Sequence, residues 1–392
     1  MAYIISYSGP FWCPDSGVHY TRVLARDHEL HLLSFIESED ECSAIPYLDE
    51  CFVTVDTVIL SRKQQLLNMG LAFLRGRSLW LQRFWSAAMQ HKVDWRLQGE
   101  TFDIVYCYTI RMGMYVEKHH KPYRILDYVD AVSLLVSRMA SHTRFWPKRR
   151  LLSREARLIE RVQVQMGPRF DECWMVSDAD REAVANWHEA HIRVVRNGVD
   201  SDYFAPLSLP DSKEPTLLFV GYMGDESVAA LLHFFNEALD AIVEQFPNLV
   251  VNVVGADPPA SIIALSNDPH IKVLGFVPDL RTVYAQAHLL IAPMPFVAGV
   301  QNKVLEALAM GLPAMVTRYA NEGIKAGPDE GVLAVEDVSE FAAGVKCVLS
   351  NHEEWRRRAL HNGRKFVMEC FRWEIAAERV RQIVLEKKLA EK

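Results

Sequence analysis

One segment of the sequence brings together a glycine, a lysine and a glutamate at spacings that suit a phosphate ester. Gly299 follows a short apolar run and precedes a segment of helical period that begins near Asn302. Glycine lets the backbone approach a ligand closely, and the unpaired N–H groups of a helix N-terminus favour anions. The amides at this helix start are those of Val300, Gln301, Asn302 and Lys303. We therefore expect this loop and helix start to cradle a phosphate.

Two charged side chains extend this expectation. Lys303 places a positive charge in the first helical turn, where the helix dipole disfavours a cation unless an anion is near. Glu306 lies one turn later on the same face, and its carboxylate can accept hydrogen bonds from the two vicinal hydroxyls of a ribose. A plainer interpretation is also open, in which Lys303 and Glu306 form a solvated ion pair and Gly299 only makes a turn.

The elements that must position this segment follow an alternating pattern. Short apolar runs alternate with longer segments of helical period, which indicates parallel sheets built from strand–helix–strand units. The predicted strands are 4–7, 31–35, 103–108, 124–127, 173–176 and 193–195, then 216–220, 249–254, 271–274, 289–292 and 314–317. The main predicted helices are 63–90, 149–165, 227–245, 280–287 and 302–310.

The length of 392 residues exceeds the roughly 250 to 300 residues of a single core, so we expect more than one domain. Residues 200–215 contain three prolines and few periodic apolar positions, which is typical of an interdomain linker. The pattern predicts an α/β protein with two Rossmann-like domains, residues 1–200 and 201–371. Residues 372–392 are predicted to form a terminal helix.

Composition excludes several classes of protein. Residues 1–199 carry 25 Lys and Arg against 24 Asp and Glu, and the remainder carries 18 against 26, so no broad basic surface for nucleic acid is expected. The seven cysteines are scattered without a Cys-x-x-Cys pair, which argues against a disulfide framework or zinc site. With no signal-peptide pattern and no apolar window of membrane-spanning length, we expect a cytoplasmic protein.

The segment from Gly299 to Pro313, Gly-Val-Gln-Asn-Lys-Val-Leu-Glu-Ala-Leu-Ala-Met-Gly-Leu-Pro, resembles the donor-site signature of family 4 retaining glycosyltransferases of the GT-B fold. Within it, the motif Gln-Asn-Lys-Val-Leu-Glu-Ala resembles that of bacterial sugar transferases associated with exopolysaccharides. Further matches in the family's order are 195–200, 218–223, 273–281 and 371–374. The resemblance is strong over 172–375 and weaker before it. It implies that the two domains face a cleft and that the last helix crosses back to the N-terminal domain.

The resemblance also implies roles on the donor side. Residues 299–303 would bind the diphosphate and sugar, and Glu306 the ribose. Gly221 would let the donor phosphates approach, and the backbone around Val277 would hold the base. The charge that neutralises the diphosphate would come from Lys303, Arg196 or Arg318.

On the acceptor side, the resemblance places Asp130 and the loop 14–19 opposite the donor. Ser16 and Gly17 stand where the family has a Gly-Gly pair, and His19 is a candidate to orient an acceptor hydroxyl. Asp127 falls at the end of a predicted strand, where either ligand binding or capping of the next helix is open. Lys303, Asp130 and His19 are thus the candidate catalytic side chains.

The sequence departs from the family at two points. Ala298 stands eight residues before Glu306, where many members have a glutamate and the closer branch an arginine. Tyr222 and Met223 follow Gly221, where many members place Arg and Lys. These departures leave open a non-catalytic nucleotide-sugar or glycan-binding protein on the same fold, and more remotely a sugar-nucleotide epimerase.

The resulting expectation is an enzyme that moves a hexose-type sugar from a nucleoside diphosphate to a hydroxyl of a glycan, a lipid-linked or a small-molecule acceptor. Such enzymes stabilise the leaving diphosphate with helix N-termini and cations, so no cofactor and no metal is expected. The Asp-x-Asp motifs at 178–180 and 200–202 match a metal-binding pattern, but we interpret them as a helix start and a linker turn.

Residues 66–95 mix leucines and three tryptophans with three arginines. Such a mixture suits either a peripheral position at the inner face of a membrane or ordinary core packing with a few surface arginines.

Overall fold

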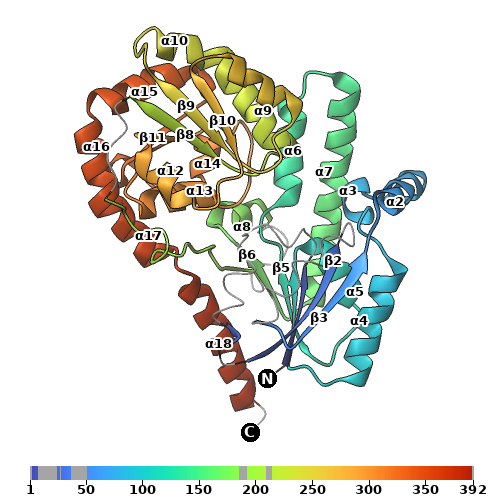
Figure 1. The fold of residues 1–392 in the computed structure, drawn as a ribbon. Helices are drawn as coiled ribbons and strands as arrows, with labels where there is room; N and C mark the ends of the chain where they lie inside the picture. The colour runs from blue at the N-terminus through green and yellow to red at the C-terminus, as the bar shows by residue number, and fades with distance from the viewer. Residues whose placement is uncertain are drawn as a thin grey trace. The chain divides into compact units, whose positions relative to one another are not determined.

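The computed structural model describes residues 2–7, 24–26, 28–36, 51–184, 192–208 and 214–390. The chain divides into two compact units (Figure 1). Unit 1 comprises Met1–Arg196 together with Trp373–Lys392, and unit 2 comprises Asn197–Arg372. The sequence placed the corresponding boundaries after residues 200 and 371.

Unit 1 contains a parallel sheet of seven strands in its described residues, in the order β3-β2-β1-β4-β5-β6-β7. The first strand lies inside the sheet, and the chain winds first to one edge and then to the other. The strands are β1 (Ala2–Tyr7), β2 (Glu29–Ile36), β3 (Thr54–Ile59), β4 (Ile104–Tyr108), β5 (Tyr123–Asp127), β6 (Glu172–Met175) and β7 (Ile192–Val194). Every residue of β4 and β6 is buried, as expected for strands covered on both faces.

The helices of unit 1 follow the strands in the doubly wound pattern. They are α2 (Arg62–Leu74), α3 (Leu79–Gln82), α4 (Ala87–Gly99), α5 (Ile110–Val116), α6 (Val132–His142), α7 (Trp146–Met166), the 3-10 turn Gly167–Arg169 and α8 (Asp178–Val184). The predicted continuous helix over 63–90 is wrong, because the chain breaks there into α2, α3 and the start of α4. Ser78 and Ser86 cause the restarts, since each hydroxyl accepts an amide of the next helix and caps it.

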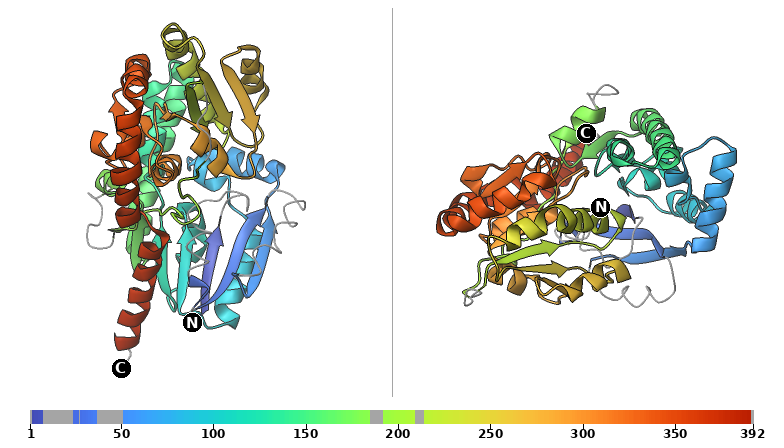
Figure 2. Two further views of the ribbon diagram at one scale, coloured as in Figure 1. Left: turned by 60° about the vertical axis from the view of Figure 1, so that its left-hand side comes forward. Right: turned by 90° about the horizontal axis from the view of Figure 1, so that it is seen from above.

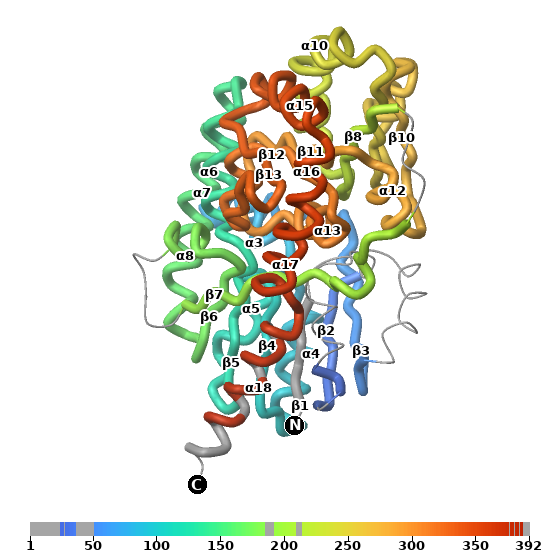
Figure 3. The backbone as a smooth tube through the Cα atoms, turned by 90° about the vertical axis from the view of Figure 1, so that its left-hand side faces the viewer, coloured from blue at the N-terminus to red at the C-terminus, as the bar shows by residue number. Residues whose placement is uncertain are grey.

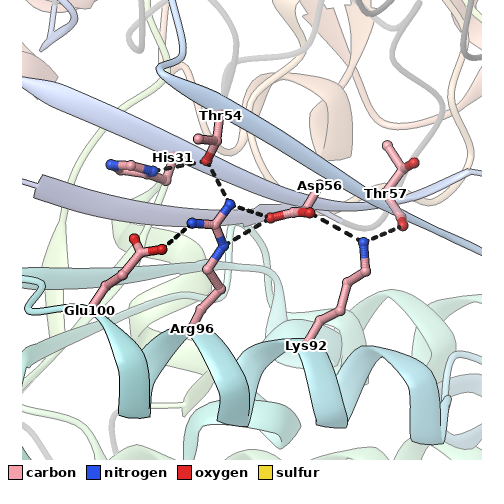
Figure 4. Close-up of polar contacts among 7 residues, drawn as sticks. All are labelled: His31, Thr54, Asp56, Thr57, Lys92, Arg96 and Glu100. Atoms are coloured by element: carbon pink, nitrogen blue, oxygen red, sulfur yellow. Dashed lines mark hydrogen bonds and ion pairs between the residues drawn. The ribbon is translucent and has the colours of Figure 1, made fainter.

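Charged side chains fasten α4 to the edge strand β3 (Figure 4). The guanidinium of Arg96 donates to Asp56 at 2.6 Å and to the hydroxyl of Thr54 at 3.1 Å. Lys92 also donates to Asp56, at 3.2 Å. These bonds lower the pKa of the Asp56 carboxyl, against the opposing effect of burial, and they fix the edge that the sequence pattern missed.

Unit 2 contains a parallel sheet of six strands in its described residues, in the order β10-β9-β8-β11-β12-β13. The strands are β8 (Thr216–Val220), β9 (Val250–Val254), β10 (Ile271–Gly275), β11 (Leu289–Ala292), β12 (Ala314–Thr317) and β13 (Val332–Val335). Relative to chain order this is 3-2-1-4-5-6, the Rossmann order, in which the winding direction reverses between β8 and β11.

Helices cover both faces of the unit 2 sheet (Figure 2). They are α9 (Asp225–Phe234), which continues through Phe235–Leu239 into α10 (Asp240–Val243), then α11 (Ala260–Ile263), α12 (Leu280–Gln286), α13 (Asn302–Ala309), α14 (Arg318–Asn321), α15 (Phe341–Ser350), α16 (His352–Arg358) and α17 (Arg364–Cys370). Short helical turns occupy Ala264–Asn267, Pro328–Glu330, Val338–Glu340 and Ala359–Gly363.

The last helix, α18 (Trp373–Ala390), belongs to unit 1 although the chain has just left unit 2. Trp373, Ala377 and Ile383 are buried in a cluster with residues of β4, β5 and β6, and α18 lies over these strands in Figure 3. Arg379 donates to the buried carboxylate of Glu172 at 3.0 Å. This position of the last helix is the one that the resemblance implied.

The predicted α/β architecture with two doubly wound sheets is confirmed. Each predicted strand overlaps an observed one, and the sequence pattern missed β3 and β13. Both lie at sheet edges, where a strand is covered less completely and its apolar signal is weaker. No helix of the described residues is long and apolar enough to span a membrane.

Candidate functional site

The candidate site lies in unit 2 at the reversal point between β8 and β11. In open α/β sheets, ligands bind outside the carboxyl ends of the strands where the winding direction reverses. Gly221 follows the end of β8, and residues 293–301 lead from the end of β11 into α13. The topology therefore brings these two segments, 72 residues apart at their nearest ends, to one edge of the sheet.

Unpartnered amides line the start of α13. Within the described part of the chain, the N–H groups of Val300, Gln301, Asn302 and Lys303 donate to no acceptor. The N-cap residue Gln301 makes no side-chain capping bond. Gly299 precedes them with φ of 75°, a left-handed conformation that favours glycine. Consecutive amides of this kind at a helix start can bind an anion, and this is the role that the sequence analysis predicts for them.

Lys303 carries its ammonium from α13 to the end of β8. Its Nζ atom lies 4.6 Å from the centre of the buried Phe219 ring, and 3.0 Å from the point where a Cβ atom on Gly221 would stand. Among the described residues, no carboxylate or other acceptor binds this ammonium. Burial lowers the pKa of Lys303 to about 8, against the smaller opposing effect of Glu306. A cation in this state favours an incoming anion.

Glu306 is held by a tyrosine that sequence reasoning missed. The Tyr284 hydroxyl, from α12, donates to Oε2 of Glu306 at 2.6 Å and lies 3.4 Å from the backbone oxygen of Lys303. Burial raises the pKa of the Glu306 carboxyl, and the bond from Tyr284 and the charge of Lys303 oppose that shift. Tyr284 uses one oxygen of the carboxylate. No short-range pattern reveals this contact, because it joins two helices 22 residues apart.

The loop after β10 is fixed by residues of the linker. Asp279 is the N-cap of α12, and its carboxylate accepts from the backbone amide and the guanidinium of Arg281. Tyr203 stacks under the Arg281 guanidinium at 4.4 Å and donates to Asp279 at 3.3 Å. Val277, the residue expected at the base, lies partly buried in this loop, beside Phe276, whose side chain is 73% exposed.

The three side chains predicted to neutralise the diphosphate differ in their surroundings. Arg196 lies in unit 1, where it donates to Asp178 at 2.7 Å. Arg318, at the start of α14, pairs with Glu336 at 3.1 Å. Of the three, only Lys303 has no carboxylate within ion-pair distance among the described residues.

The residues expected on the acceptor side belong to unit 1. Ser16, Gly17 and His19 lie outside the described residues. Asp127 ends β5 and is buried, where it accepts from the Tyr106 hydroxyl and from the amide of Val129 at 2.8 Å. Burial raises the pKa of Asp127 to about 6, against these two bonds. The carboxylate thus shapes the turn after β5.

Asp130 is partly buried just beyond this turn, near Arg111 at the start of α5. Burial and the nearby Arg83 lower the pKa of Arg111 to about 10, while Asp130 raises it. Thr109 and Val129, at the ends of β4 and β5, have positive φ values of 72° and 67°. Such strained positions gather at functional edges, and sequence reasoning missed Thr109 and Arg111 because strain and long-range charge leave no local pattern.

The two Asp-x-Asp segments have ordinary roles in local structure. The Ser177 hydroxyl accepts from the amide of Asp180, and the Asp180 carboxylate accepts from the amide of Ala131 at 3.0 Å. Asp200 accepts from the amides of Asp202 and Tyr203, which closes a turn. No group of three or more potential metal ligands occurs among the described residues.

Comparison with known proteins gives one family match. A family model described as glycosyl transferases group 1 matches residues 214–351, which include Gly221 and all of Gly299 to Glu306. No curated protein matches the chain.

Several solved structures resemble the whole chain. Sucrose-phosphate synthase from Thermosynechococcus elongatus has a TM-score of 0.76 at 16% identity, with 100% of both chains covered. Anabaena HepE in complex with UDP and glucose has a TM-score of 0.69 at 13% identity, covering 97% of this chain and 98% of HepE. WaaG, a glycosyltransferase involved in lipopolysaccharide biosynthesis, has a TM-score of 0.64 at 15% identity, covering 98% and 99%.

At these identities the similarity shows the fold alone, and it is the GT-B fold that the sequence predicted. The segment with Lys303 and the four amides lies within the part of the chain that matches the group 1 family model. The chain thus has the fold of GT-B glycosyltransferases, and its residues 214–351 match the group 1 glycosyl transferases, which together support sugar transfer as its activity.

Proposed function

We propose that the protein transfers a hexose-type sugar from a nucleoside diphosphate to a hydroxyl group, with retention of the anomeric configuration. The observation that carries this proposal is the cluster at the start of α13. There, within the part of the chain that the structure describes, four amides have no acceptor and the Lys303 ammonium has no carboxylate partner, one helical turn before Glu306. A bound diphosphate would supply acceptors for the amides and an anionic partner for the Lys303 ammonium.

Each group has a task in the proposed reaction. As the bond from C1 of the sugar to the diphosphate breaks, negative charge grows on the leaving oxygen, and the amides of 300–303 with Lys303 stabilise it. The acceptor hydroxyl forms the new bond to C1, and its proton passes to an oxygen of the departing phosphate. Glu306 accepts hydrogen bonds from the ribose through its free oxygen, while the backbone near Val277 holds the base.

The donor is proposed to carry uracil or guanine. HepE was solved with UDP-glucose, which makes UDP-glucose the first donor to test. The acceptor is proposed to be a glycan, a lipid-linked or a small molecule, with Asp127, Asp130 and His19 on its side. The reaction is proposed to need no metal or other cofactor, because fixed amides and Lys303 supply the charge, so activity is expected to persist in chelator.

The proposal is tested first by calorimetry with UDP and GDP. The release of UDP is then measured with UDP-sugars and a panel of acceptors. Glu306→Ala is expected to weaken donor binding by about 10- to 100-fold, because a hydrogen bond to a charged group is lost. Glu340→Ala removes an exposed glutamate of the same unit and is the matched control. If Glu306→Ala and Lys303→Ala both leave turnover unchanged, the site assignment is wrong.

A second candidate is a non-catalytic nucleotide-sugar-binding protein. Ala298 favours it, because an alanine makes no polar contact to the transferred sugar. Tight binding of UDP or GDP without diphosphate release across the acceptor panel is the outcome expected of this candidate.

A further inference from the structure

Helix α2 in unit 1 presents its apolar side chains to solvent and its polar ones to the protein. Its buried residues are Gln65, Asn68 and Ala72. Its exposed large apolar residues are Leu66 (67%), Leu67 (64%), Leu71 (50%), Phe73 (60%) and Leu74 (81%). A surface helix ordinarily has the reverse arrangement, with the apolar stripe towards the core.

The inward polar face is bound in place. Asn68 donates to the backbone oxygen of Trp85 at 2.7 Å, and Gln65 donates to that of Leu60 at 3.1 Å. The Arg83 guanidinium in turn donates to the side-chain oxygen of Gln65 at 2.6 Å. Rotating α2 to bury its leucines would break these bonds and leave buried polar groups unsatisfied. The outward orientation of the leucines is therefore a property of the fold.

The apolar face of α2 is broad, and a side-chain contact joins its end to a neighbouring helix. At 3.6 residues per turn, its exposed leucines and Phe73 span an arc of about 160°. The Arg154 guanidinium of α7 lies 5.7 Å from the Phe73 ring, so the end of α2 adjoins the first half of α7 (Figure 1). Phe145 (66%), Trp146 (65%) and Leu151 (39%), at the start of the same helix, are exposed as well. We call α2 together with residues 145–151 the leucine-rich face.

The sequence segments that carry this face are rich in cations, and Glu155, which follows them, is buried and paired with Arg154. Residues 57–93 and 131–154 contain 12 of the chain's 43 Lys and Arg residues and none of its 50 Asp and Glu residues. Exposed members that form no ion pair within the described structure are Lys63, Arg75, Arg77, Arg144, Lys148, Arg149 and Arg150. On a chain with a net charge of -7, such a segregation of cations points to an anionic partner surface.

We propose that the leucine-rich face docks on a membrane that contains anionic phospholipids. Exposed leucines and aromatic rings bordered by lysine and arginine fit the boundary between acyl chains and anionic headgroups. The leucines enter the apolar layer while the cations meet the phosphates. An acidic protein would satisfy the cations but not an apolar arc of this width. The inference goes beyond sugar transfer and does not depend on it.

The test is co-sedimentation of the full-length protein with vesicles of phosphatidylcholine alone or with added phosphatidylglycerol. Binding is expected only with the anionic vesicles and is expected to fall as salt is raised. Leu67→Ser combined with Leu71→Ser and Leu74→Ser is expected to weaken it by about tenfold or more. Lys148→Glu combined with Arg149→Glu and Arg150→Glu is expected to have a similar effect. The matched control replaces two exposed apolar residues elsewhere, Ile263→Ser with Leu385→Ser.

Three outcomes overturn the proposal. They are no binding of the natural protein to anionic vesicles, equal binding by the leucine variant, and a dimer in solution that the leucine variant dissociates without any vesicle binding. The last outcome would assign the face to a second copy of the chain. Thermal unfolding of the same variants separates loss of folding from loss of docking. Calorimetry with UDP is expected to give unchanged affinity for the leucine and cation variants, because their substituted residues lie in unit 1 and the candidate donor site in unit 2.

Discussion

Lys303 carries a partly buried ammonium that lies over the Phe219 ring, next to Gly221 at the end of β8. Its pKa of about 8 means that the protein without a ligand carries an unfavourable charge in this position. Groups of this kind are retained where a ligand supplies the missing partner, at a cost in stability of the free protein. The residue therefore connects the stability of unit 2 with its proposed function.

Replacing this ammonium by a neutral side chain of similar shape separates the two effects. Lys303→Met is expected to lower turnover by about 100-fold, the size of effect seen when one group that stabilises a leaving charge is removed. The same change is expected to raise the free energy of unfolding without nucleotide by about 1 to 3 kcal/mol at pH 7, since the buried charge is gone. Release of UDP measures turnover, and urea unfolding measures the free energy of unfolding.

The control for this substitution is Lys272→Met, which removes an exposed lysine from β10 in the same sheet. It is expected to change neither turnover nor stability by much. A Lys303→Met protein that is both fully active and less stable would show that the ammonium has a structural role only.

Donor affinity is expected to depend on pH through the same group. The ammonium is charged below pH 8, so UDP affinity is expected to fall about tenfold between pH 7 and pH 9. The stability of the protein without nucleotide is expected to depend on pH in the opposite direction. The ordinary pKa of 10.5 exceeds the folded value of about 8, so the unfolded chain binds more protons between these limits. The contribution of Lys303 to stability therefore rises with pH over that window.

Calorimetry with UDP at several pH values measures this dependence, and Lys303→Met is expected to show a flat profile over the same range. A natural protein whose UDP affinity does not change between pH 7 and pH 9 would contradict the assignment of the ammonium to the diphosphate.

At the scale of elements, the site depends on how closely the end of β8 approaches the start of α13. Gly221 allows this approach, because a Cβ atom there would stand 3.0 Å from Nζ of Lys303 and within 3.6 Å of the Phe219 ring. The backbone of Gly221 has no positive φ, so an alanine fits its conformation and only displaces the ammonium. The glycine is therefore needed for space.

Gly221→Ala is consequently expected to reduce turnover by about tenfold, since a small displacement of a positioned charge weakens its effect on the reaction. The melting temperature is expected to change little. Gly327→Ala is the matched control in the same unit, because the new Cβ atom would meet only a glutamate oxygen at 3.4 Å. Turnover is measured on both variants. If Gly221→Ala and Gly327→Ala have the same turnover, the space at Gly221 does not position the ammonium.

At the scale of the molecule, the chain returns to unit 1 after completing unit 2. The cluster that α18 completes contains Trp174 and Tyr106 as well as Trp373 and Ile383, so the first unit needs residues from both ends of the chain. Unit 1 therefore cannot finish its core until almost the entire chain has been synthesised. The candidate donor site, by contrast, is built from residues of unit 2 alone.

This arrangement predicts that stability and donor binding respond to different substitutions. Trp373→Ala is expected to lower the free energy of unfolding of unit 1 by about 3 to 5 kcal/mol, because a buried indole is lost from the core. UDP affinity under native conditions is expected to stay the same. Chemical unfolding and calorimetry measure the two, with the half-exposed Ile375→Ala as control. Loss of UDP binding by a folded Trp373→Ala protein would contradict this separation.

The sequence by itself determined the alternation of strands and helices, the two doubly wound sheets and the segment Gly299–Glu306. These features are local, since a buried parallel strand reads as an apolar run and a helix start as a change of period. The edge strand β3 and the breaks between α2, α3 and α4 were not predicted, because partial exposure and capping serines give weaker signals.

Only the tertiary structure decided which side chains meet. The bond from Tyr284 to Glu306, the position of Lys303 over Phe219 and the outward leucines of α2 all depend on contacts between distant segments. The physical reason is that hydrogen bonds and burial are set by what lies opposite a residue in space. A pattern of residue types along the chain specifies its own backbone period but not its neighbours across the fold.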